Sequence, residues 1–415
     1  MIARLAAALL LALSASACST EVVCTTSEVT CGGQCAALAS DPANCGACGR
    51  SCLAGESCSA GLCCQGSQCP PAVYAACFNG SAVQGATDGA VAVGAPVAVE
   101  SGPVALAWRG TSLWVANSIS NTVDRMEVSA SGLAPGGPFP TVRIPVSGPF
   151  SDLEFLAEYA GRLYVSNAAI GTLVVIDPAA DQPIVAEWDL GAGSYPQGIA
   201  FAGNKAYVAL NGTGAVAVVD LAALRVTKTL SLSALASPGG FALPSRLLVV
   251  GSRLYVTLWN LDASYFPAGN GRLAVIDTTT DELVPGVNPV DLGSACENPA
   301  GLAVTGHVLA VTCGFFPWNA TGPADIVGAA FVPVDLSGTV PVVGTAVPAR
   351  DLAPVPAPFA PGAITFCNGM GFVGDRFSGR VFRFDASSGR VTAQGLVCAP
   401  TSTGSSFVAD VACGK

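Results

Sequence analysis

The stretch from Arg162 to Val219 decides the fold. It reads RLYVSN at 162–167 and LVVID at 173–177, continues with an apolar run at 184–190, and begins again with AYVAL at 206–210. Glycine, asparagine, aspartate and proline separate these runs. Short apolar runs bounded by such residues are typical of antiparallel strands joined by tight turns. The stretch therefore predicts a repeating unit of four short strands.

The same unit recurs along most of the chain, at spacings of 43 to 62 residues. A valine marks its second strand, at Val115, Val165, Val208, Val256, Val311 and Val373. An acidic residue ends its third strand, at Glu127, Asp177, Asp220, Asp277, Asp335 and Asp385. Four strands with a period in the forties are typical of a β-propeller blade. Because an aspartate at a strand end accepts hydrogen bonds from the next turn, we interpret these acids as turn residues.

Six complete units run from residue 104 to residue 397, and strand-like pieces remain at both ends. The C-terminal run at 407–412 fits one inner strand, and the N-terminal runs at 73–78, 82–84 and 91–99 fit three outer strands. Together they would form a seventh blade and remove the open sheet edge. We therefore expect an all-β, seven-bladed propeller of four-stranded antiparallel blades, closed by N- and C-terminal strands. A six-bladed ring with ragged ends is the alternative.

Two of the units resemble a known repeat. The motifs are LYVSN at 163–167 with VVID at 174–177, and LYVT at 254–257 with AVID at 274–277. They are similar to the repeats of YVTN-type β-propeller proteins, over approximately residues 73–413. The match is weaker in the fifth and sixth units, where Ala310 and Phe372 replace the tyrosine. The resemblance implies a propeller and little about chemistry, because propellers host many unrelated functions.

Residues 1–17 are typical of an export signal and not of a folded element. Arg4 supplies the positive charge, and residues 5–13 form the apolar core. The segment Ala15-Ser16-Ala17 is a cleavage site for ordinary secretion. Cys18 follows it directly and resembles the lipidated cysteine of bacterial lipoproteins, although Ala15 stands where a leucine is usual.

The number of cysteines favours a lipid on Cys18. The chain has 17 cysteines, so removing Cys18 leaves an even number that can all pair. We expect a lipoprotein of the outer membrane or cell surface, with a secreted or periplasmic protein as the alternative. No other segment has the roughly 18 apolar residues of a spanning helix, so the membrane contact would be the lipid anchor alone.

Residues 24–69 hold ten cysteines and few large apolar side chains. Such a segment needs cross-links to fold, and disulfides are the usual ones in exported modules. Zinc is the alternative, since Cys45 and Cys48 have ligand spacing, but the segment has no histidine. The pattern resembles the modules of stigma-specific secreted proteins, which implies a disulfide-rich spacer over residues 18–70. Pro70-Pro71 then leads into the propeller, residues 71–415.

The composition and motifs exclude several function classes. The net charge of −10 argues against nucleic acid as a partner. The single histidine, His307, cannot build a catalytic triad repeatedly or a histidine metal cluster, and we interpret it as a surface turn residue. Phosphate-loop and G-x-S-x-G signatures are absent, and the carboxylates are scattered. We therefore expect no catalytic residues, no metal and no cofactor.

The expected function is binding of a protein, peptide or glycan at the cell surface without catalysis. An exported propeller enzyme of the metal-dependent hydrolase or lyase type is one alternative. A passive structural surface protein is another. A propeller metal would be held over the axial channel, but the sequence identifies no ligands for it.

Two long loops mark the expected binding site. They run from Leu258 to Arg272 and from Cys313 to Gly328, and long loops in compact domains are often functional. Their aromatic residues are Trp259, Tyr265, Phe266, Phe315, Phe316 and Trp318. Asn260, Asp262, Asn319 and Asp325 add polar groups, and the shorter loop of the sixth unit adds Asp375, Arg376 and Phe377. We expect this patch, and not the central channel, to contact the partner. The alternative is that the rings form a local core over two blades.

The propeller cysteines also suggest cross-links. Cys296 and Cys313 flank a hairpin whose turn lies at residues 305–306, so antiparallel pairing places them opposite each other and predicts a disulfide. Cys77, Cys367, Cys398 and Cys413 remain. We expect these four to pair among themselves and lock the closure, with three connectivities open.

Overall fold

The structure is a computed structural model that describes residues 24–25, 28–38, 40–45, 48–49, 51–52, 55–59, 62–65, 72–129, 132–136, 141–144, 152–315, 327–349, 361–386, 389–400 and 407–414. The export signal and Cys18 lie outside these residues. The chain divides into two compact units, Met1–Cys63 and Cys64–Lys415. Each is described by itself.

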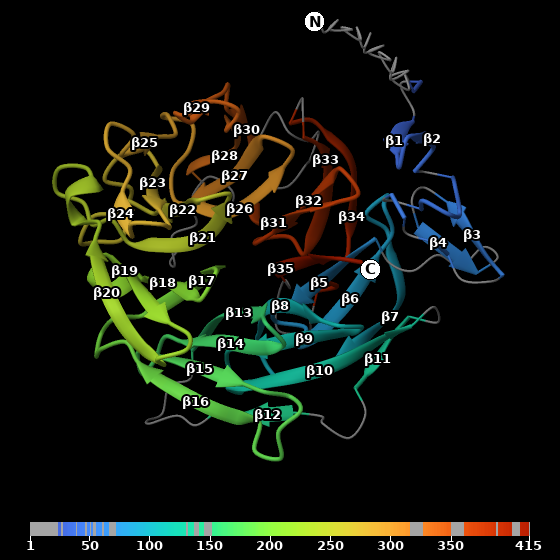
Figure 1. Ribbon diagram of the computed structural model, residues 1–415, viewed down its shortest axis with the longest axis horizontal. Coiled ribbons are helices and arrows are strands. Elements are labelled where there is room, and N and C mark those ends of the chain that lie inside the picture. Colours follow the sequence, from blue (N-terminus) through green and yellow to red (C-terminus); the bar gives the residue numbers. More distant parts are fainter. Residues whose placement is uncertain are drawn as a thin grey trace, which may run out of the picture. The chain divides into compact units, whose positions relative to one another are not determined.

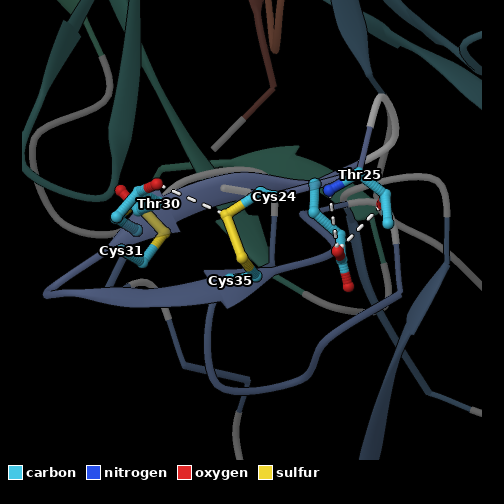
Figure 2. The surroundings of a disulfide bond; sticks show 7 residues. Cys24, Thr25, Thr30, Cys31 and Cys35 are labelled. Carbon is cyan, nitrogen blue, oxygen red and sulfur yellow. Dashed lines mark hydrogen bonds between the residues drawn. A yellow bond between two sulfur atoms is a disulfide. The ribbon is translucent and has the colours of Figure 1, made fainter. Parts of the chain in front are cut away.

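Disulfides hold the smaller unit together. Strand β1 (Val29–Cys31) pairs with β2 (Gln34–Ala36) in a short hairpin, and β3 (Glu56–Ser59) and β4 (Leu62–Gln65) follow. The bonds are Cys24–Cys35, Cys31–Cys48 and Cys45–Cys58. Figure 2 shows the first of them beside Thr30, whose hydroxyl lies 3.3 Å from the Cys24 sulfur. These bonds confirm the prediction of a disulfide-rich module, in which cross-links replace a large apolar core.

The larger unit is a seven-bladed propeller (Figure 1). Blade 1 comprises β8 (Pro103–Arg109), β9 (Ser112–Asn117), β10 (Thr122–Ser129), β11 (Gly132–Pro135) and β12 (Thr141–Arg143). Blade 2 comprises β13 (Leu153–Tyr159), β14 (Arg162–Asn167), β15 (Thr172–Ile176) and β16 (Ile184–Asp189). Blade 3 comprises β17 (Pro196–Ala202), β18 (Lys205–Leu210), β19 (Ala215–Asp220) and β20 (Arg225–Ser231).

The remaining blades repeat the pattern. Blade 4 comprises β21 (Pro244–Val250), β22 (Arg253–Leu258), β23 (Arg272–Asp277), β24 (Glu282–Leu283) and β25 (Val290–Asp291). Blade 5 comprises β26 (Pro299–Thr305), β27 (Val308–Phe315), β28 (Val327–Asp335), β29 (Val342–Val343) and β30 (Val347–Pro348). Blade 6 comprises β31 (Pro361–Cys367), β32 (Met370–Asp375), β33 (Arg380–Asp385) and β34 (Val391–Leu396).

The closing blade joins the two ends of the chain. Its inner strand is β35 (Val408–Cys413), and its outer strands are β5 (Val73–Cys77), β6 (Ala82–Ala86) and β7 (Ala92–Ala98). Val408 pairs with Cys77 and Cys413 pairs with Val73, so the two ends form one antiparallel ladder. This sheet confirms the prediction of seven blades closed by N- and C-terminal strands.

Burial of the middle strands explains the repeated valines. Val165, Val208 and Val256 are fully buried, because each sheet packs against the sheets before and after it. Burying one such side chain stabilises the fold by roughly 1.5–3 kcal/mol. A charge at any of these positions would therefore open the contact between two blades.

The acids at the strand ends are turn residues, as the sequence predicts. Asp177, Asp220, Asp277 and Asp335 each accept a hydrogen bond from a backbone N–H two residues later, at 2.7–3.0 Å. Glu127 differs, because it forms an ion pair with Arg125 on the same strand. The outer strands of blades 1, 4 and 5 are split in two, where one run was expected in each. In blade 4, Pro285 and Pro289 lie between the two pieces and have no N–H to donate to the sheet.

Helical structure is scarce in the described part of the chain. It comprises two short 3-10 turns, Asn211–Thr213 and Ser233–Leu235, and one helical residue, Ala349. Among these residues no helix has the length and apolar character that would let it cross a membrane.

Candidate binding site

In every blade the second strand ends, and the third strand begins, at one common face of the propeller. In blade 4, Leu258 at the end of β22 pairs with Pro244 at the start of β21 and with Arg272 at the start of β23. Blade 1 has the same arrangement around Asn117. The starts of the inner strands therefore share one end of the propeller with the connections between second and third strands. We call this end the loop face.

The long loop of blade 4 has a defined framework on this face. Asn260 is fully buried, and its amide nitrogen donates to the Asn270 carbonyl at 2.7 Å and to the Ser237 hydroxyl at 2.9 Å. Asp262 accepts from the N–H groups of Ser264 and Phe266 at 2.7 and 3.0 Å. These bonds fix the loop before any partner arrives. The two polar residues are thus part of its framework.

The predicted aromatic residues differ in their accessibility. Tyr265 is 61% exposed, Phe266 is 46% exposed and Trp259 is half-buried. Phe315 ends β27, whose backbone pairs Phe315 with Val327. Phe316 and Trp318, with Asn319 and Asp325, lie outside the described residues. For the blade 4 loop, the exposed rings of Tyr265 and Phe266 argue against a purely internal core.

Two further exposed aromatic residues on this face were missed by the sequence analysis. Tyr195 is 39% exposed and Phe241 is 54% exposed, and both precede the inner strand of their blade. Phe241 forms an isolated bridge with Leu261, so its backbone lies next to the long loop of blade 4. The missed signal is an aromatic residue shortly before the proline that begins β17 or β21.

The backbone of Tyr265 and Tyr195 is strained. Their φ angles are +61° and +49°, a region that bulky residues rarely adopt. Such a conformation costs of order 1–3 kcal/mol and is found preferentially at functional sites. The hydrogen bonds of the surrounding loops keep both residues in this conformation despite its energetic cost.

A disulfide fixes the base of the blade 5 loop. Cys296 and Cys313, which the hairpin spacing places opposite each other, are bonded with a Cα–Cα distance of 5.2 Å. Both are fully buried. The bond ties the start of β26 to the strand from which the loop departs.

A polar cavity of about 220 Å³ lies where the inner strands begin, on the same face. Its charged lining residues are Asp152 and Glu154 from blade 2, Arg246 from β21 and Arg376 from the blade 6 loop. Phe78 and Phe407 from the closing blade contribute apolar walls. We call it the axial cavity.

Neutral donors satisfy two acids at the axial cavity. Asp152 accepts hydrogen bonds from the Tyr195 hydroxyl and, at 3.0 Å, from the Ser118 hydroxyl. Asp410, on the neighbouring inner strand β35, accepts from the N–H groups of Leu106 and Val411 at 2.8 and 2.9 Å. Burial raises the pKa of Asp410 to about 6.

Glu154 has a more strongly perturbed carboxyl group. Burial, together with the nearby Asp152 charge, raises the pKa of Glu154 to about 7, although Arg246 and Arg376 oppose the shift. At neutral pH the carboxyl is therefore only partly ionised. Perturbed groups of this kind cluster at functional sites, although structural networks produce them as well.

The two predicted residues of the blade 6 loop, Asp375 and Arg376, have different surroundings. Asp375 has no accessible surface, and its carboxylate accepts from the N–H groups of Phe377 and Ser378 at 3.1 and 3.0 Å. That burial argues against the prediction that Asp375 contacts a ligand. Arg376 is exposed and lines the axial cavity. The prediction that the aromatic patch, and not the central channel, contacts the partner did not include this charged cavity.

The remaining predictions about chemistry concern metals and histidine. In the described ranges, no three His, Cys, Asp or Glu side chains are grouped so that they could hold a metal ion. His307 has a side chain that is 67% exposed, in the turn between β26 and β27, with its Nε2 atom 3.9 Å from Asp335. This turn lies at the end opposite the loop face.

Comparison with known sequences identifies the N-terminal module. Residues 10–66 match the model of the Stigma-specific STIG1-like protein family. The match agrees with the three disulfides found in this region and confirms the resemblance seen in the cysteine spacing. No curated protein matches the chain at a significant level.

Several solved structures superimpose on this chain, and their names are unrelated to one another. A protein from Lactobacillus plantarum superimposes with a TM-score of 0.57 at 14% identity, covering 82% of this chain and 98% of that one. Kuenenia stuttgartiensis hydrazine synthase gives 0.54 at 18% identity, covering 69% and 77%. Virginiamycin B lyase from Staphylococcus aureus gives 0.52 at 14% identity, covering 72% and 85%. At these identities the similarity shows the fold alone.

Proposed function

We propose that this protein is an exported, lipid-anchored surface protein whose propeller binds a protein, peptide or glycan at the loop face without catalysis. The disulfides indicate an exported protein, because such bonds persist in oxidising compartments. The propeller fold is a common scaffold for protein interactions. The cysteine-rich module would act as the spacer between the anchor at Cys18 and the propeller.

The observation that carries the proposal is the exposed pair Tyr265 and Phe266 on a hydrogen-bonded loop. Aromatic side chains combine a large apolar area with few rotatable bonds, and they dominate the energetics of many interfaces. A loop fixed by the Asn260 and Asp262 hydrogen bonds loses little conformational entropy when a partner binds. Phe241, whose backbone is bridged to this loop, is also exposed, so blade 4 presents three exposed rings.

A binding function also suits the side chains on this face. Hydrophobic surface that stays in contact with water lowers solubility unless a partner covers it. The charged groups of the axial cavity lie at the centre of the same face and would add polar recognition. A protein, peptide or glycan can use both features.

A binding screen with the full chain tests the proposal. Fluorescently labelled protein is applied to a glycan array and to a peptide array, and each hit is repeated with Tyr265→Ala/Phe266→Ala. The control is Leu224→Ala/Val342→Ala, two residues that are 47% and 61% exposed and lie away from the loop face. We expect hits to lose at least tenfold in affinity with the first variant and nothing with the control, in line with ~1.4 kcal/mol per tenfold.

Two results would contradict the proposal. One is a folded wild-type protein with no hit on either array. The other is a hit whose affinity is unchanged in the folded aromatic variant. A stoichiometric metal on the purified protein, together with turnover of a bound compound, would favour an enzyme instead.

A further inference from the structure

The axial cavity contains two arginine side chains whose charges lack carboxylate partners. In the part of the chain that the structure describes, neither Arg246 nor Arg376 has a carboxylate within ion-pair distance. Asp152 and Asp410 are held by hydroxyl and backbone N–H donors, as described above. Asp152 and Asp410 thus have hydrogen-bond donors of their own, and the guanidinium groups remain available to an incoming anion.

The backbone of blade 6 positions Arg376. The Arg376 stem crosses Gly362 on β31 so closely that a Cβ atom at Gly362 would lie 2.5 Å from Arg376 Cγ and 2.9 Å from Cδ. Only glycine leaves this path open. The guanidinium group thereby reaches the cavity from a loop that Asp375 braces.

Arg246 is fixed from the inner strand of blade 4. Its Nε atom donates to the Ala300 carbonyl at 3.4 Å, and its guanidinium carbon lies 5.0 Å from the centre of the Phe155 ring. A cation over a ring face is held in orientation by the ring's quadrupole. Burial of the guanidinium group in the cavity and, to a smaller extent, repulsion from Arg246 lower the pKa of Arg376. An anion between them would relieve that repulsion.

We propose that the axial cavity is a binding site for a small monocarboxylate, held between Arg246 and Arg376, with apolar contacts to Phe78 and Phe407. The carboxylate belongs to a free small acid, to an acidic sugar or to a peptide C-terminus. A guanidinium group matches a carboxylate with two parallel hydrogen bonds. This site stands apart from the aromatic surface of the proposed function and does not depend on it.

The charges of the cavity favour a single negative charge on the ligand. With Glu154 protonated, the remaining carboxylates near the two arginines are Asp152 and Asp410, and neither lies within ion-pair distance of a guanidinium group. A monoanion then adds one charge that both guanidinium groups face. A phosphate dianion would add two charges beside the same acids and would be repelled more strongly.

The affinity depends on pH through Glu154. The charged and titratable groups around it are Asp152 on its own segment, Tyr195, Arg246, Arg376 and Asp410. A bound carboxylate favours the protonated form of Glu154, so binding takes up a proton. Once Glu154 ionises above about pH 7, it repels the ligand and competes for the arginines. Binding is therefore tighter at pH 6 than at pH 8.5.

Calorimetric titration of the full chain tests this site. The acids are D-glucuronate, as an acidic sugar, and N-acetylglycine, as a peptide terminus; glucose and N-acetylglycinamide are their neutral partners. Inorganic phosphate is compared with the acids at pH 8.5, where it is a dianion. We expect at least one acid to bind with its neutral partner inactive, phosphate to bind more weakly, and affinity to fall between pH 6 and 8.5. Arg376→Gln and Arg246→Gln should each weaken the acid at least ~10-fold, since each removes charge-assisted hydrogen bonds.

The controls separate this proposal from the previous one. Arg383→Gln, on β33 of the same blade and paired with Asp88, should leave acid binding unchanged. So should Tyr265→Ala/Phe266→Ala, so the two sites succeed or fail independently. If an arginine variant does not fold, the pH dependence of the wild type still tests the site. The proposal is overturned if neither acid binds at millimolar concentration, if a neutral partner or phosphate binds as tightly as the acid, or if both folded arginine variants bind like the wild type.

Discussion

Cys77 on β5 is bonded to Cys398, which follows β34, across 321 residues of chain. A second bond joins Cys367 on β31 to Cys413 on β35. Both bonds link blade 6 to the closing blade, whose sheet combines strands from the N-terminal and C-terminal parts of the propeller. The expectation that these four cysteines pair among themselves and lock the closure agrees with this connectivity. The ring is thus closed by backbone hydrogen bonds and by covalent bonds at the same seam.

The first prediction compares this seam with a local disulfide. By the chain-entropy argument, a bond across 321 residues raises the free energy of the unfolded chain by about 6 kcal/mol. The 17-residue separation of Cys296 and Cys313 gives about 3 kcal/mol. Cys77→Ser/Cys398→Ser should therefore lower the melting temperature more than Cys296→Ser/Cys313→Ser. Differential scanning calorimetry of the two double variants measures the difference. Equal losses would show that the seam bond does not act by limiting the unfolded chain.

The fold could be predicted because its determinants are local. The valine of each second strand and the acid of each third strand recur with the blade, and the structure places the valines in the core and most of the acids in turns. Even the closing blade could be inferred, because the two leftover pieces of chain together supplied the four strands that every blade needs.

The binding face was less predictable, because it depends on convergence in space. Glu154 and Arg246 are charged residues near the start of mainly apolar inner strands. In sequence they read as ordinary strand residues, and only closure of the ring brings them to one cavity. Arg376 was selected for its loop, but its path across Gly362 is a tertiary feature. Charged residues at the second or third position of an inner strand are the signal to look for in other propellers.

The second prediction concerns the lipid anchor. If Cys18 is the lipidated first residue of the mature chain, Cys18→Ser should move the protein from the membrane fraction to the soluble fraction. The physical reason is that an acyl chain contributes ~0.8 kcal/mol of membrane affinity per buried CH₂ group. Fractionation of both forms, with mass spectrometry of the N-terminal peptide, measures the outcome. A soluble wild-type protein with an unmodified N-terminus would favour ordinary secretion after Ala17.

The third prediction concerns a hydrogen bond between blades 3 and 4. The buried Tyr207 hydroxyl donates to Asp281 at 2.5 Å, and Asp281 also forms an ion pair with Lys205 at 2.7 Å. Tyr207→Phe should lower the free energy of unfolding by about 1–2 kcal/mol, because removal of the hydroxyl leaves the Asp281 carboxylate with one hydrogen-bond donor fewer.

Tyr74 offers a matched control for this loss. It is also fully buried, but in the described chain its hydroxyl has no hydrogen-bond partner, and burial raises the pKa of Tyr74 to about 12. Tyr74→Phe should therefore be neutral or stabilising, since it removes an unsatisfied polar group. Chemical denaturation of both variants gives the comparison. A larger loss for Tyr74→Phe than for Tyr207→Phe would contradict it.

The last prediction uses the raised pKa of Glu154, which is about 7 in the folded protein and near 4.5 for an ordinary glutamate. Because the fold disfavours the ionised form, this group lowers stability as pH rises from about 4.5 through 7, and the full penalty applies above that range. Glu154→Gln keeps a neutral hydrogen-bonding group of similar shape. We expect the variant to melt about 1–3 °C higher than the wild type at pH 8 and equally at pH 4.5. Glu187→Gln on the exposed outer strand β16 serves as the control and should raise neither melting temperature.

The buried Asp410, whose pKa is raised to about 6, also makes the stability fall as pH rises, so the Glu154→Gln variant should keep a weaker pH dependence below pH 6. A variant that is less stable than the wild type at pH 8 would mean that ionised Glu154 interacts favourably with Arg246 and Arg376. Those arginines would then bind an added anion less strongly, because Glu154 already occupies them.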